Sequence, residues 1–118
     1  MKTYEITAFG EKATVRLETL AYRPMPHCEK PLAIRVIEIL PDGEEECLGN
    51  LTVNLDPWTH RQDQSETRAF AKTYEENEGW AQQIIDALVA TGAAKKTDIT
   101  LHNFKTTFPL YEFDKEKL

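Results

Sequence analysis

Every second residue is apolar over residues 2–9 of the chain and again over residues 13–20. This two-residue periodicity is typical of half-buried β-strands. Residues 9–12 (FGEK) supply a turn between the two runs. The pattern therefore predicts an antiparallel hairpin at the start of the chain.

A second strand pair is predicted around a Pro-Asp-Gly turn at residues 41–43. Pro fixes φ and Gly accepts positive φ, so this sequence favours a tight turn. Residues 32–40 (LAIRVIEIL) are apolar at almost every position, which indicates a strand covered on much of both faces or one that changes face at a bulge. Residues 47–55 return as a strand, with Leu51 and every second residue after it facing inward.

A helix is predicted over about residues 75–91, because apolar residues recur at i, i+4 and i+8 from Trp80 onward. Residues 73–76 (TYEE) fit a capping box, and Asn77 is a rival cap. Gly92 fits the position that ends a helix.

Three further segments complete the predicted fold. Residues 67–73 fit a short edge strand, residues 99–101 a short strand and residues 107–113 a final strand. The pattern predicts a single α+β domain over residues 1–118, with a twisted antiparallel sheet of about five strands and the amphipathic helix packed on one face. Residues 115–118 are expected to fray.

The final strand has apolar residues on both faces. Phe108 and Leu110 are expected on one side, and Tyr111 and Phe113 on the other side of a slightly bent strand. Together with the LTVNL run at residues 51–55, this strand indicates a folded α+β domain.

The chain is acidic, and its negative charge is concentrated in the middle third. The net charge is −6, and residues 40–86 carry eleven acidic and three basic side chains. Nonspecific nucleic-acid binding needs a basic face, so this balance argues against it. We expect a solvated turn and a helix N-terminus in these clusters; the alternative is an acidic surface that attracts a basic partner.

The hydrophobic fraction of 41% is ordinary for a soluble protein. No apolar run approaches the roughly 20 residues that span a bilayer. The first residues, MKTYEITAFGEK, lack the apolar region of a signal peptide. The sequence therefore predicts a cytoplasmic protein without a membrane partner.

Cys28 and Cys47 are expected to be reduced thiols, as in most cytoplasmic chains. The predicted turn places Cys47 about ten strand residues from Cys28, or roughly 30 Å. A disulfide requires Cα atoms within about 7 Å. The proline-rich loop at residues 23–31 leaves a closer approach open.

No motif for catalysis or metal binding stands out. His27, His60 and His102 lie far apart, and no Cys-x-x-Cys or His-x-x-x-His spacing occurs, which argues against a zinc site. Neighbouring residues of an extended chain point to opposite sides, so His27 is a poor activator for Cys28. A glycine-rich phosphate loop is missing too. We expect no enzymatic activity, no metal and no cofactor.

Trp58, His60 and Arg61 form the strongest candidate binding surface. They lie in the polar loop of residues 56–66, and Trp and Arg often anchor interfaces. A Trp in such a loop either packs back over the core or stays exposed for a partner. Tyr22 and the exposed strand edges are weaker candidates; an open edge can accept another chain.

Five motifs follow one another along the chain: PLAIRVIEILPDGE at residues 31–44, LTVNL at residues 51–55, an AF-x-x-T segment at residues 69–73, Gly92, and FPLYEF at residues 108–113. As a set they resemble a family of small uncharacterised proteins found on conjugative and other mobile elements of gut bacteria. The chain departs from that family in a longer helix, in the segment at residues 93–103 and at Phe108, where members have Tyr. The family has no established catalytic or binding residues, so the resemblance implies only an accessory role on a mobile element.

These observations predict a non-enzymatic protein that binds another protein through residues 56–66 or a strand edge. The alternative is an acidic decoy that imitates DNA and blocks a nuclease or a DNA-binding protein. The acidic residues of 40–86 motivate it, and it requires their charges on one face. An enzyme is the third hypothesis, which requires His60 or His27 to converge with carboxylates in a pocket. The oligomeric state stays open.

Overall fold

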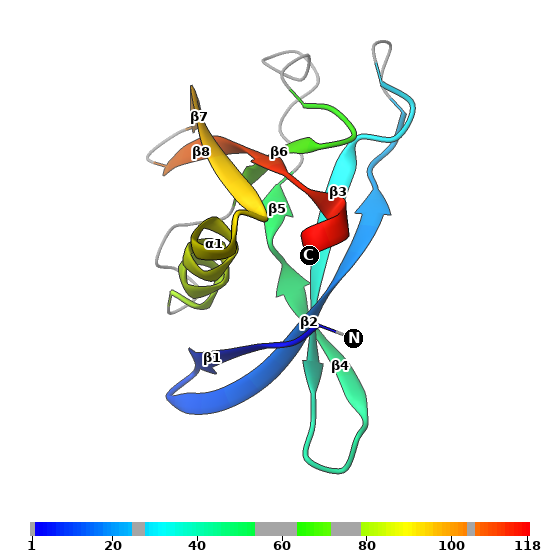
Figure 1. Cartoon of the computed structure of the whole chain (residues 1–118), viewed down its shortest axis with the longest axis vertical. Coiled ribbons are helices and arrows are strands. Elements are labelled where there is room, and N and C mark those ends of the chain that lie inside the picture. The colour runs from blue at the N-terminus through cyan, green and yellow to red at the C-terminus, as the bar shows by residue number, and fades with distance from the viewer. Residues whose placement is uncertain (1, 25–27, 54–63, 72–78, 104–105) are drawn as a thin grey trace.

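Two antiparallel sheets of four strands each and one α-helix make up the domain (Figure 1). The computed structural model describes residues 2–24, 28–53, 64–71, 79–103 and 106–118. The first sheet has the order β1-β2-β3-β4, with β1 at Tyr4–Ala8, β2 at Glu11–Ala21, β3 at Leu32–Ile39 and β4 at Glu45–Asn50. The second sheet has the order β5-β6-β8-β7, with β5 at Thr52–Val53, β6 at Arg68–Ala71, β7 at Ala94–Asn103 and β8 at Thr106–Phe113. Helix α1 is Trp80–Thr91, and a 3₁₀ helix, η3, is Lys115–Lys117.

The predicted single sheet of about five strands is wrong, because the strand expected at residues 47–55 bends at Leu51. Its first part, β4, pairs with β3, whereas β5 pairs with β6. At the bend the Leu51 N–H donates to the Ile34 carbonyl (2.8 Å), and the Ile34 N–H donates to the Thr52 hydroxyl (3.1 Å). The chain thus passes from one sheet to the other while still bonded to β3.

Two short strands also differ from their predictions. β6 is not an edge strand, because it lies between β5 and β8. β7 is much longer than the strand expected at residues 99–101, and its register with β8 shifts between Lys96 and Thr100. Both differences come from long-range pairing with β8, which local patterns do not encode.

Helix α1 begins later than predicted. Gly79 is its N-cap residue, with φ 77° in the left-handed region, so α1 starts at Trp80 and does not continue back through residue 79. The predicted capping box at residues 73–76 lies outside the described residues. The predicted stop at Gly92 is confirmed: its φ is 80°, and the following N–H, of Ala93, donates to the Leu88 carbonyl (2.8 Å).

The first predicted hairpin is confirmed, with a shorter turn. Ala8 pairs with Glu11, so Phe9 and Gly10 alone form the turn. Both have positive φ, 53° and 80°, which is the backbone geometry that matches the twist of a two-residue hairpin. The turn at residues 41–43 is confirmed as well.

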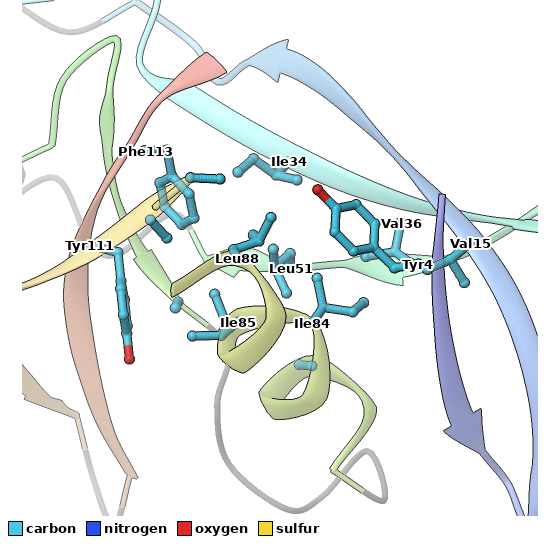
Figure 2. Packing of buried hydrophobic residues seen from close by; sticks show 14 of the residues in the cluster. Tyr4, Val15, Ile34, Val36, Leu51, Ile84, Ile85, Leu88, Tyr111 and Phe113 are labelled. Carbon is cyan, nitrogen blue, oxygen red and sulfur yellow. The ribbon is translucent and has the colours of Figure 1, made fainter. Parts of the chain in front are cut away.

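The main core lies between the two sheets and α1 (Figure 2). From the helix, Ile84 and Leu88 point into it, and both are completely buried. The two faces of β8 divide as predicted. Tyr111 and Phe113 join the main core, while Phe108 and Leu110 join Phe70 in a second cluster. At the end of the chain, where fraying was expected, Asp114 caps η3 by accepting from the Glu116 N–H (3.1 Å).

The Tyr4 hydroxyl points into the main core (Figure 2) and has no hydrogen-bond partner among the described residues. Burial raises the pKa of Tyr4, so the hydroxyl stays neutral at ordinary pH. Tyr4→Phe removes an unsatisfied polar group and is expected to raise the free energy of unfolding by about 1 kcal/mol in urea titrations.

Tyr22→Phe is the matched control for Tyr4→Phe, because the Tyr22 hydroxyl has a partner, the Thr52 hydroxyl at 2.8 Å. This variant should lower the free energy of unfolding by about 1 kcal/mol. Equal losses in both variants would contradict the assignment of Tyr4 as unsatisfied.

Candidate functional site

Trp58, His60 and Arg61 lie outside the described residues, so their proposed role as an interface stays a prediction. Tyr22, the fourth candidate, is half-buried and bonded to Thr52 at the point where the chain changes sheets. Burial is the main cause that raises the pKa of its hydroxyl. Tyr22 therefore has a structural contact, and whether it also touches a partner stays a prediction.

The two cysteines are free thiols, as predicted. Cys28 is half-buried and Cys47 is exposed on β4. His27 and His60 lie outside the described part of the chain. Within the described part, no group of three or more His, Cys, Asp or Glu side chains is placed to hold a metal ion. The described segments also include no helix long and apolar enough to cross a membrane.

At Thr7 the outer edge of β1 is occupied by Gln83 of helix α1. In a hairpin with a two-residue turn, Ala8 and Ile6 bond to β2, so Thr7 turns its peptide groups outward. The Thr7 N–H donates to Gln83 Oε1 and Gln83 Nε2 donates to the Thr7 carbonyl, both at 2.9 Å. The side-chain amide of Gln83 thus makes, at Thr7, the pair of hydrogen bonds that another strand would make.

The outer edge of β4 is different. The Leu40 N–H donates to the Glu44 carbonyl (2.8 Å), so Glu44 faces β3. By the alternation of an antiparallel ladder, the peptide groups of Glu46 also point toward β3, as those of Glu44 do. The N–H and C=O groups of Glu45 and Cys47 point outward. All three residues from Glu45 to Cys47 are exposed. This edge belongs to the hairpin that extends away from α1 in Figure 1, and within the described part of the chain no other strand pairs with its outward peptide groups.

The β4 edge is limited at one end by a bulge. Val36 pairs with Gly49 and Ile37 with Cys47, so Leu48 is the extra residue of β4. Leu48 packs against the main core. A bulge ends regular pairing along an edge. The regular part of the edge therefore runs from Glu45 to Cys47.

The side chains of the β4 edge differ in charge between its two faces. On one face Glu45 accepts two hydrogen bonds from Arg16, both at 2.8 Å, and these bonds lower the pKa of the Glu45 carboxyl. On the other face Glu46 stands directly opposite Glu38 of β3. Among the described residues, no basic side chain lies within 4 Å of the Glu38 or Glu46 carboxylate. One face is neutralised and the other is not.

The described acidic residues of 40–86 lie in three separate parts of the fold. Asp42 and Glu44–Glu46 lie at the β3–β4 hairpin, Glu66 lies beside Cys28, and Asp86 lies on α1, where it accepts a hydrogen bond from Gln82 (2.8 Å). The other five of the eleven acidic residues, Asp56, Asp63, Glu75, Glu76 and Glu78, lie outside the described residues. Whether all eleven charges form the single face that a DNA imitation requires stays a prediction.

A hollow of about 440 Å³ lies beside the irregular part of β7. There the Thr97 hydroxyl donates to the Leu110 carbonyl (2.8 Å), and the register of β7 is interrupted. Arg68, Lys95 and Lys96 line the hollow together with Asp98 and Glu112, and Arg68 lies 3.7 Å from Glu112. This mixture of charges selects no particular ligand.

Sequence reasoning named strand edges as candidates but did not single out β4. The signal available was the run Glu44–Glu46 next to the predicted turn. We expected a solvated turn there, with an acidic surface for a basic partner as the alternative. Comparison with known proteins adds no further candidate: no family model, no curated protein and no solved structure matches this chain.

Proposed function

We propose that this is a non-enzymatic protein-interaction protein that binds another protein by strand addition at the outer edge of β4. The observation that carries the proposal is the set of outward peptide groups at Glu45 and Cys47, which lie on an exposed strand. The edge of β1, in contrast, is bonded at Thr7 to the side chain of Gln83. Strand addition derives its affinity from main-chain hydrogen bonds of this kind. The resemblance to mobile-element proteins adds an accessory role on such an element, in the cytoplasm, to the proposal.

Cys47→Pro tests this function. Proline removes the outward N–H of residue 47 but no bond of the β3–β4 ladder, so the sheet tolerates it at an edge. We expect wild-type protein to bind members of an immobilised library of short, β-prone synthetic peptides. Cys47→Pro should weaken that binding by about tenfold or more, because the lost main-chain bond and the proline ring both oppose pairing.

Cys47→Ala is the matched control, since it removes the thiol and keeps the N–H. It should bind the same peptides with unchanged affinity. Circular dichroism checks that both variants remain folded. The proposal is wrong if the folded Cys47→Pro variant binds as wild type does, or if wild type binds no peptide of the library.

A further inference from the structure

We infer that the strand added to β4 is a basic segment with Lys or Arg at alternate positions, directed to the face that carries Glu46. This inference rests on the proposed function and names the chemistry of the partner. It starts from the pair Glu38–Glu46, because carboxylates directly opposite each other on neighbouring strands destabilise a sheet.

Cross-strand pairs elsewhere in the molecule combine opposite charges. Glu18 stands opposite Arg35 in the first sheet, with 3.4 Å between carboxylate and guanidinium. Glu112 stands opposite both Arg68 and Lys95 in the second sheet. The row Glu38–Glu46 is different, because it has two carboxylates and, within the described residues, no cation.

A strand added at the β4 edge would place a third residue beside Glu38 and Glu46, in the same row of cross-strand neighbours. Its residue opposite Glu46 would lie on the same face as both carboxylates, at the distance of a cross-strand pair. Lys or Arg at this position would relieve the repulsion and form the kind of row that Glu112 makes with its two cations. The row therefore favours a basic residue in the partner.

The spacing of the partner's charges follows from alternation. Glu44 lies two residues before Glu46 and so projects to the same face, whereas Glu45 projects to the other face and is already paired with Arg16. A second basic residue, two positions from the first, would lie opposite Glu44. The residue between the two would lie opposite Glu45, and the next residue beyond the first would lie opposite Cys47. Neither position gains from a positive charge.

The test uses two synthetic peptides of alternating pattern, with Val or Thr between charged residues that are Lys in one peptide and Glu in the other. We expect wild-type protein to bind the Lys peptide at least about tenfold more tightly than the Glu peptide. Glu46→Lys should weaken binding of the Lys peptide by at least about tenfold and reverse the preference. This variant should also fold, because it removes the repulsion with Glu38.

Glu66→Lys is the matched control. It makes the same change in net charge at an exposed residue away from β4, so it reproduces any long-range attraction without altering the row. The inference is overturned if both variants weaken binding equally, or if the two peptides bind wild type equally well. If Cys47→Pro loses binding but wild type shows no preference between the two peptides, the proposed function stands and only the basic partner is rejected. If Cys47→Pro and wild type bind the Lys peptide equally, both proposals are rejected.

Discussion

Leu88→Ala is expected to lower the free energy of unfolding by about 2–5 kcal/mol. Leu88 is completely buried and points from α1 into the cluster shared by both sheets (Figure 2). Truncation removes the transfer free energy of its side chain and leaves a cavity between layers that the backbone holds apart. Urea denaturation followed by circular dichroism measures the loss as a lower midpoint with an unchanged slope.

Val89→Ala is the control for this prediction, because Val89 is the next residue of the helix and is 45% exposed. Its loss should be within about 0.5 kcal/mol. Similar losses at both positions would mean that α1 does not pack with the Leu88 face against the sheets.

Gly49→Ala is expected to cost about 2–4 kcal/mol, from backbone strain and overpacking together. Gly49 has φ 155°, and a Cβ on it would lie 3.2 and 3.3 Å from two carbon atoms of the Trp80 indole. Trp80 is only 3% exposed, so its ring has little space to move. Thermal unfolding should show a lower midpoint for the variant.

Gly43→Ala separates the two causes. Gly43 has φ 90°, but a Cβ on it would meet no atom within 4 Å. Its cost should be that of the backbone alone, about 1–2 kcal/mol. A Gly49→Ala variant no less stable than Gly43→Ala would show that the Trp80 ring does not approach β4 as described.

Local patterns were enough to predict much of this fold. The alternation around Tyr4 and Ile6 identified β1 and its buried face, and the spacing of Trp80, Ile84 and Leu88 identified the buried side of α1. Periodicity works here because each of these elements buries one face against a single core.

The change of sheet at Leu51 could not be predicted in this way. Leu51 and Val53 share one face of an ideal strand, yet Leu51 packs in the main core and Val53 against the second cluster. The bend is stabilised by hydrogen bonds to Ile34, which is distant in sequence. Only the three-dimensional pairing determines it.

The candidate site depends even more on long-range structure. Whether an edge is open depends on strand order and on what packs beside the edge. The local sequence does not reveal that β1 and β4 are the two edges of the first sheet, or that Gln83 bonds to β1 and not to β4. The acidic run from Glu44 to Glu46 was visible, but its division into one face paired with Arg16 and one opposite Glu38 required the register. The loop with Trp58 remains a second prediction, outside the described residues.

Amide hydrogen exchange, measured residue by residue with and without the Lys peptide, tests the central claim most directly. Without peptide, the Glu45 and Cys47 amides should exchange quickly, and those of Glu46 and Thr7 should be protected by their hydrogen bonds. Adding the peptide should slow exchange at Glu45 and Cys47 and leave Thr7 unchanged. Binding that leaves the Glu45 and Cys47 amides exchanging as before would contradict strand addition at β4.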